Sequence, residues 1–223
     1  MIEHMICRHT CIQTLIVGLQ LFGFITAGPT VVFGKEEGQA SFIKKLIEAA
    51  IERTHHHVTY DGRYHPIPYP MGDIPDDVGV CTDVVIRSFR SVGIDFQRLV
   101  HDDMQSHFSA YPNFWGLHKS DPNIDHRRVP NLQAFLTRNG TVLPITLDET
   151  TYAAGDLVTW TVANHLPHIG IVTDHLVPGT KRPMIVHNNG KGPTLEDMLL
   201  SFPITGHYRY GQNRTMRTSA LAQ

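Results

Sequence analysis

Cysteine and net charge are both scarce in this 223-residue chain. Of its three cysteines, Cys7 and Cys11 lie at the N-terminus, which leaves Cys81 without a disulfide partner in the rest of the chain. The formal net charge is only −2, and no basic stripe or acidic tail points to a nucleic acid or a membrane surface as partner. With 41% hydrophobic residues, the composition excludes a disordered or fibrous chain and fits one globular domain.

Long apolar runs are also scarce, because only residues 11–28 form one. Arg8 and His9 precede the run, and small residues followed by "GKEEGQ" come after it. This order is typical of a secretory signal, although an uncleaved anchor helix has a similar length. We therefore expect residues 1–28 to be a signal peptide or N-terminal anchor, and 36–212 to be an exported periplasmic or secreted domain. Membrane contact would occur only through an uncleaved segment.

Apolar periodicity places helices in the first part of the domain and strands in the second. Helical spacing is found in the residues around 41–53, with a cap at or just before Ser41, and in residues 82–92, 102–108 and 129–138. Short β-rich runs follow in "AGDLVTWTV", "HIGIVTD", "PMIVHNN" and "GHYRY". This order predicts an α+β domain in which a helix packs on an antiparallel sheet.

Cys81 precedes the predicted helix 82–92, in "GVCTDVVIRSF". Unpaired backbone N–H groups at a helix start favour a thiolate, so this position suits a nucleophile; a buried, inert thiol is the alternative. A cysteine nucleophile also needs a base, usually a histidine held by a third polar group. His168 in the predicted strand "HIGIVTD" is the candidate base, and Gly170 on the same strand face leaves room for a closely packed neighbour.

The third polar group is expected on the next strand. If "HIGIVTD" and "PMIVHNN" form a hairpin, either His187 or Asn188 lies opposite His168. We favour His187, because that pairing centres the turn on Val177 and Pro178.

The order of Cys81, His168 and His187 resembles that of the NlpC-type, papain-like cell-wall cysteine peptidases. The stretches "YPMGDIPDDVGVCTDVVIRSFRSVGIDFQRLVHDDM", "DPNIDHRRVPNLQAFLTRNG" and "HNNGKGPTLEDMLLSFPITGHYRY" are similar to a YijF-like exported bacterial family, domain of unknown function family 1287, from about Tyr60 to Tyr210. The superfamily resemblance implies a papain-like fold and, without a cofactor, hydrolysis of amide bonds in peptidoglycan stem peptides. Cys81 then matches the nucleophile, His168 the general base and His187 the orienting residue.

One departure from the superfamily pattern lies beside the nucleophile. NlpC-type enzymes commonly carry Ser or Asp before the cysteine and Ser after it, whereas this chain has Val80 and Thr82. This difference puts the geometry on the substrate side of the predicted site in doubt.

Further candidate substrate contacts lie near the predicted site. In "NIDHRRVPN", Asp125, His126, Arg127 and Arg128 either grip a substrate carboxylate through the paired arginines or form a structural salt-bridge knot. Asp83 either strengthens the helix start or contacts a substrate amine. Tyr64 is a candidate oxyanion donor beside the Cys81 N–H, and Asn188 is a further substrate contact.

The sequence leaves three other functions open. A zinc-dependent hydrolase would use His165, His168, His187 and either Cys81 or an Asp, although no HxxxH or CxxC spacing supports a metal site. A binding module would hold wall peptides without cutting them, and an acyl transferase would pass the acyl group to another acceptor. We expect no metal or cofactor, and a peptidoglycan or peptide partner.

Overall fold

The computed structural model describes residues 33–211, so the predicted signal segment and both N-terminal cysteines lie outside the described residues. The described helices are α1 (Phe33–Arg53), α2 (Cys81–Arg90), α3 (Phe96–His107) and α4 (Val129–Asn139). The strands are β1 (Thr59–Tyr60), β2 (Val78–Gly79), β3 (Thr141–Val142), β4 (Leu157–Val162), β5 (Leu166–Leu176), β6 (Pro183–Asn188), β7 (Pro193–Glu196) and β8 (Ile204–Arg209).

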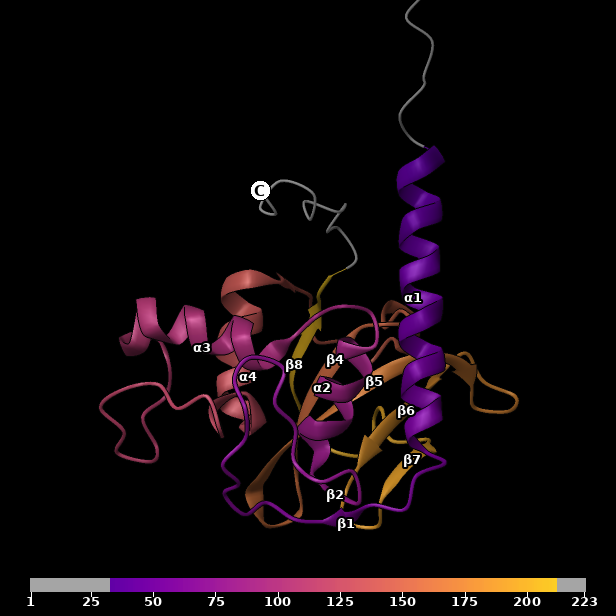
Figure 1. Ribbon diagram of the computed structural model, residues 1–223. Coiled ribbons are helices and arrows are strands. Elements are labelled where there is room, and N and C mark those ends of the chain that lie inside the picture. The colour runs from indigo at the N-terminus through magenta and orange to yellow at the C-terminus, as the bar shows by residue number, and fades with distance from the viewer. Residues whose placement is uncertain (1–32, 212–223) are drawn as a thin grey trace, which may run out of the picture.

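Six of these strands form one antiparallel sheet in the order β3-β8-β4-β5-β6-β7. The short strands β1 and β2 pair in parallel beside the start of α2. Figure 1 shows α2 lying across the sheet, with α1 on one side and α3 and α4 on the other. The expectation of an α+β domain with an antiparallel sheet is confirmed.

Strand alternation divides the core into two layers. On the helix side, Phe89 of α2 packs with Ile169 and Ile171 of β5. On the other side, Trp160 packs with Val172 in a smaller cluster closed by the loop around Leu199. Both faces of the central strands are therefore covered, which is why "HIGIV" is apolar on both faces apart from His168.

Two helices begin earlier than the sequence predicts. The first begins at Phe33 rather than near Ser41, and α3 begins at Phe96 rather than at Asp102. Asp95 caps α3, because its side chain accepts a hydrogen bond from the Gln97 N–H at 3.1 Å. In residues 33–211, no helix combines the length and apolarity needed to cross a membrane.

Candidate active site

Cys81 is the first residue of α2, and a buried carboxylate fixes the turn that carries it. The Asp83 Oδ2 atom accepts a hydrogen bond from the Val80 N–H at 2.7 Å, which satisfies one of the donors at the helix start. Gly79, immediately before this turn, lies so close to Asp83 that a Cβ there would approach the Asp83 Cβ to 3.2 Å. The nucleophile candidate therefore sits on a tightly held backbone.

Arg127 holds Asp83 in place. Its Nε donates to Asp83 Oδ1 at 2.9 Å and its Nη2 to Oδ2 at 3.1 Å, and both side chains are almost fully buried. Its remaining donors reach the backbone carbonyls of Asp61 and Arg63. Thr82 adds a further link by donating from Oγ1 to the Arg127 carbonyl at 3.0 Å. The guanidinium of Arg127 is thus bound within the fold, which agrees with the structural salt bridge and not with a grip on substrate.

The Cys81 thiol points at the backbone of β5. The Val172 N–H donates to the carbonyl of Asp156, the residue just before β4. Since N–H directions alternate along a strand, the N–H of Ile169 points the other way, toward β6. Among the described residues, the ladder between β5 and β6 stops at Ile171 and Val186. The Ile169 N–H is therefore left to face Cys81 Sγ, where it favours the thiolate.

Burial nevertheless dominates the acidity of the thiol. Cys81 is only 4% exposed, and burial raises its pKa to about 11, with the nearby Asp83 carboxylate adding to the rise. The Ile169 and Thr82 N–H groups oppose this rise. The sequence predicts a thiol pKa that is lowered by the helix start. The structure instead gives a protonated thiol, because desolvation outweighs the backbone dipoles.

A tyrosine lies against the thiol, but it is not the one the sequence indicated. Tyr60 at the end of β1 places its hydroxyl beside Cys81, and burial together with the cysteine raises the pKa of that hydroxyl. The hydroxyl of Tyr64 instead donates to Asp121 at 3.1 Å and accepts from Asn123. Sequence reasoning missed Tyr60 because the parallel pairing of β1 with β2, which brings it to Cys81, joins segments too short to be recognised by periodicity.

The predicted hairpin between β5 and β6 exists, with a different register. The observed pairs Ile171–Val186 and Val172–Ile185 set Gly170, not His168, opposite His187. The predicted turn centre was therefore wrong by about one residue. The space beside Gly170 is also filled by β6 rather than by α2, since a Cβ there would lie 2.6 Å from Ile185 Cγ2 and 3.1 Å from His187 Cβ.

His168 and His187 still meet, because residues two apart on a strand share a face. His168 Nε2 lies 2.9 Å from His187 Nδ1 in a buried hydrogen bond, with the two rings at 87°. His187 Nε2 lies 2.9 Å from Glu196 Oε1 on β7, although the two atoms do not form a hydrogen bond. Burial lowers the pKa of His168 to about 3 and that of His187 to about 4, so both rings are neutral at pH 7.

His168, His187 and Glu196 form a row of contacting side chains, and one pair of tautomers gives this row a consistent order of donors and acceptors. A proton on His187 Nε2, beside the Glu196 carboxylate, would leave His187 Nδ1 as an acceptor. His168 Nε2 would then donate to it, and His168 Nδ1 would carry the free lone pair that a general base needs.

Cys81 and His168 approach the sheet from different sides. Cys81 packs with Ile169 on the helix face, whereas His168 shares the opposite face with Trp160, their ring centroids 6.1 Å apart. No hydrogen bond joins Cys81 to His168 within residues 33–211. His168 precedes Ile169 in β5, so the thiol and the imidazole lie on opposite faces of the same strand.

Asn188 has a bracing role. Its Nδ2 donates to the Gly79 carbonyl at 3.5 Å, and its Oδ1 accepts from the N–H groups of Gly190 and Gly192. Asn188 thus ties the loop after β6 to the strand that leads into Cys81. Of the two candidates for the third position, His187 is the one that contacts His168.

The remaining residues of "DHRR" point in other directions. Asp125 accepts from the Asp121 N–H and from Arg128 Nη1, the latter at 3.3 Å. His126 is buried with its Nδ1 unpartnered, and burial lowers its pKa to about 3, with Arg127 adding to the effect. The two arginines therefore do not act as a pair.

The zinc grouping considered from the sequence does not assemble. His165 is exposed, at the turn before β5. Across residues 33–211, no group of three or more His, Cys, Asp or Glu side chains is placed to hold a metal ion.

Comparison with known proteins identifies the family. The sequence pattern of a domain of unknown function, DUF1287, matches residues 47–210. A relative named "Uncharacterized protein YijF" from Escherichia coli (strain K12) is 43% identical over 183 residues, which cover 82% of this chain and 86% of the relative. No solved structure matches. The chain therefore belongs to the DUF1287 family.

Proposed function

We propose that this protein is a cysteine hydrolase of amide bonds with a papain-like, NlpC-type fold. The observation that carries the proposal is the hydrogen bond between the buried rings of His168 and His187, with the half-exposed carboxylate of Glu196 behind them, next to Ile169, whose N–H faces Cys81. A cysteine at a helix start, a histidine and a third group hydrogen-bonded behind it are the groups that nucleophilic catalysis uses, and the proposal requires the Cys81 thiol to reach His168 when substrate binds.

In the proposed reaction, Cys81 Sγ attacks the substrate carbonyl carbon while its proton passes to His168 Nδ1. The C–N bond then breaks, and His168 returns the proton to the leaving amine, which leaves a thioester on Cys81. Water adds to the thioester with His168 again accepting a proton, and the acid product leaves with the thiol restored. Because both partners rest uncharged, proton transfer accompanies attack rather than preceding it.

The negative charge of the tetrahedral intermediate has donors nearby. The Cys81 N–H, at the first position of α2, has no intrahelical acceptor. The Tyr60 hydroxyl lies beside the thiol and keeps its proton because burial raises its pKa. Together they can form an oxyanion site, the role for which Tyr64 was first considered.

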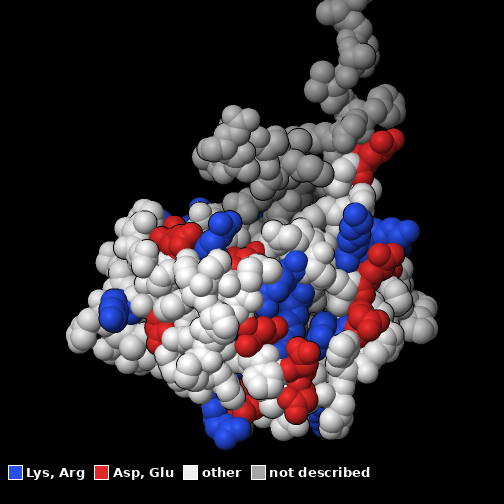
Figure 2. Space-filling model, in the orientation of Figure 1, with Lys and Arg blue, Asp and Glu red and all other residues white. Residues whose placement is uncertain are grey.

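For the substrate we propose peptide amides of the bacterial cell wall, reached after export. The resemblance to NlpC-type enzymes and the signal-like residues 1–28 support this choice. The charged side chains on the face seen in Figure 2 mix both signs, which suits a peptide substrate carrying both amine and carboxylate groups. An acyl acceptor other than water would make the same site a transferase.

A non-catalytic module that binds wall peptides is the second candidate. The observation that favours it is the burial of Cys81, because a protonated thiol that is 4% exposed is a poor nucleophile until substrate displaces its surroundings.

Digestion of isolated peptidoglycan, with products separated and weighed by mass spectrometry, distinguishes the two candidates. The wild type should release or shorten stem peptides, and Cys81→Ala and His168→Ala should each lower the rate at least about a hundredfold. His175→Gln, which changes an exposed histidine at the far end of β5, is the matched control and should retain the wild-type rate. Sedimentation with peptidoglycan but no new products in any variant would favour the binding module.

A further inference from the structure

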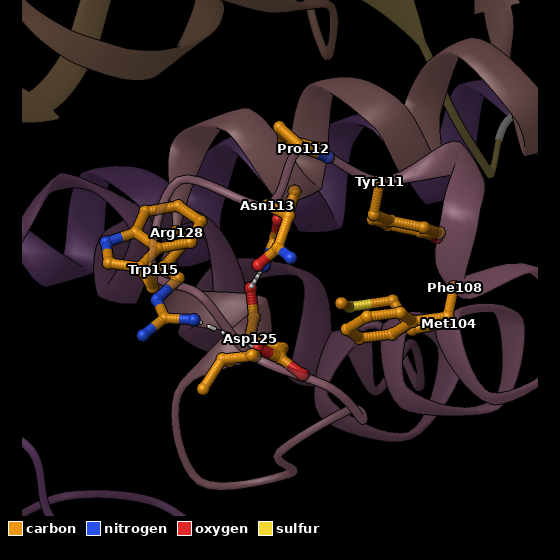
Figure 3. Close-up of a pocket in the computed structure, with 10 residues that line it drawn as sticks. Met104, Phe108, Tyr111, Pro112, Asn113, Trp115, Asp125 and Arg128 are labelled. Carbon is orange, nitrogen blue, oxygen red and sulfur yellow. Dashed lines mark hydrogen bonds and ion pairs between the residues drawn. The ribbon is translucent and has the colours of Figure 1, made fainter.

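The hollow drawn in Figure 3 is too small for a substrate. It lies between α3, α4 and the loop that joins α3 to η2 (Asp125–Arg127), and its volume is about 10 Å³, room for about one water molecule. At its side the Arg128 guanidinium carbon lies 3.9 Å from the centroid of the Trp115 ring and covers one face of the indole. A peptide therefore has no cavity to enter there, and the surface beside Cys81 is the alternative.

A free strand edge lies beside Cys81, on the outer side of β1. The Thr59 N–H donates to the Asp77 carbonyl at 2.8 Å. The N–H of the residue two positions later, Asp61, donates to the Gly79 carbonyl at 3.3 Å. Because backbone directions alternate along a strand, the N–H and C=O of Tyr60 point away from β2. Within residues 33–211, no hydrogen bond uses either of these two groups.

The outer edge of β1 faces solvent. Both residues of β1 are exposed, Tyr60 by 44%, and Figure 1 shows β1 at the rim of the molecule, outside β2. The opposite edge of this two-stranded sheet is closed, because the Val78 N–H donates to the Pro75 carbonyl and the Val78 carbonyl accepts from Arg87 at 3.2 Å. An exposed edge with a free N–H and C=O is where an extended peptide adds as a further strand.

Tyr60 connects this edge to the candidate nucleophile. Its backbone faces outward, whereas its hydroxyl lies beside the Cys81 thiol. Neighbouring strands lie about 5 Å apart, so a peptide paired with β1 runs directly alongside the residue whose hydroxyl touches the thiol. The edge is therefore placed to hold a peptide next to Cys81.

The loop between β6 and β7 closes one end of the edge. Gly192 lies against Val58, the residue before β1, since a Cβ on this glycine would lie 3.5 Å from the Val58 carbonyl oxygen. Asn188 holds the same loop to the Gly79 carbonyl and to the N–H groups of Gly190 and Gly192. The edge is thus covered at Val58 and open beyond it.

This loop presents a free positive charge. Lys191 is exposed between Gly190 and Gly192, whose φ angles of +112° and +92° turn the chain on both sides of it. Within residues 33–211, Lys191 forms no ion pair. A peptide that runs antiparallel to β1 has its carboxyl end at the Val58 end of the edge, where this loop lies. Antiparallel pairing is also the more stable arrangement.

We propose that the outer edge of β1 binds an extended peptide as an additional antiparallel strand, with its backbone paired to Tyr60 and its free carboxylate on Lys191. One peptide residue donates its N–H to the Tyr60 carbonyl and accepts the Tyr60 N–H at its own carbonyl. The inference rests on the proposed function, because it describes how the peptide substrate of that reaction is held and requires a free carboxyl end.

Nuclear magnetic resonance of the full-length Cys81→Ala protein, titrated with N-acetyl-tetra-L-alanine, tests the backbone pairing. Binding should be saturable at millimolar peptide. In the complex, hydrogen exchange of the Tyr60 N–H should slow at least about tenfold, because this group gains an acceptor. The Asp61 N–H, which is bonded to the Gly79 carbonyl without peptide, is the internal control and should change by less than about twofold.

The same peptide with a carboxamide end tests the carboxylate contact. It should bind Cys81→Ala about threefold more weakly than the acid, the effect of an exposed ion pair. With Lys191→Gln added, acid and carboxamide should bind equally. Lys45→Gln, which changes an exposed lysine of α1, is the matched control and should keep the preference for the acid.

Three results would overturn the inference: no saturable binding, unchanged exchange of the Tyr60 N–H in the complex, or equal binding of acid and carboxamide to Cys81→Ala. Because Cys81→Ala cannot hydrolyse, binding is measured apart from catalysis. Failure of the wild type to digest peptidoglycan would contradict the proposed function alone, whereas digestion without protection of Tyr60 would contradict only the strand addition.

Discussion

The protein should lose its folded structure steeply as the pH falls from about 6 to about 4. His126, His168 and His187 are buried with pKa values lowered to about 3, 3 and 4, against 6.5 for an accessible histidine. Below pH 6.5 the unfolded chain binds three protons that the folded chain does not. Each proton reduces the free energy of unfolding by about 1.4 kcal/mol per pH unit, so together they remove about 4 kcal/mol per unit.

The measurement is urea unfolding followed by circular dichroism at several pH values. The contribution of these histidines is fully present above about pH 6.5 and is lost as the pH falls toward their folded-state pKa values. His126→Met should flatten the slope by about one proton, whereas His57→Gln, at an exposed position, should not change it. Stability that is level between pH 6.5 and pH 4 would contradict the buried neutral state of these rings.

Asp83→Asn should lower the free energy of unfolding by about 3–5 kcal/mol. The change leaves the Arg127 guanidinium buried beside a neutral amide, and an uncompensated buried charge is costly. It also weakens the contact that holds Val80 at the start of α2. Chemical denaturation at pH 7.5 measures the loss.

Two further variants isolate the cause. Glu48→Gln removes an exposed partner of Lys44 and should change stability by less than about 0.5 kcal/mol. The double variant Asp83→Leu with Arg127→Met removes both charges and should recover most of the loss. A double variant as unstable as Asp83→Asn would show that the ion pair is not what stabilises this turn.

The parts of the fold with a long, regular pattern could be predicted from the sequence. The α2 and α4 segments and the strands β4, β5, β6 and β8 follow apolar spacing, and their order gave the α+β class. The parallel pair β1–β2 could not be found, because two residues per strand carry no period. The strand β7, which brings Glu196 to His187, was also missed, because its four residues begin with a proline and show no apolar alternation.

The identities of the residues in the candidate site were predicted more accurately than their positions relative to one another. The observed register differs from the predicted one by two residues, which keeps His168 and His187 on the same face of the sheet. Their contact was therefore predicted although the position of the turn was not. The acidity of Cys81 depends on how much of the chain covers it, which no local pattern reports. The partner of Arg127 is 44 positions away, so sequence spacing could not distinguish a substrate grip from an internal salt bridge.

The most direct test of a Cys81–His168 pair is the rate of alkylation of Cys81 by iodoacetamide against pH, measured by mass spectrometry of the peptide that carries it. The wild type should show a rate nearly constant from about pH 6.5 to 9, because neutral His168 accepts the thiol proton during attack. In His168→Ala the rate should be about a hundredfold lower at pH 7 and rise tenfold per pH unit toward the thiol pKa of about 11. Identical profiles in the two proteins would contradict the pair, and with it the proposed hydrolase.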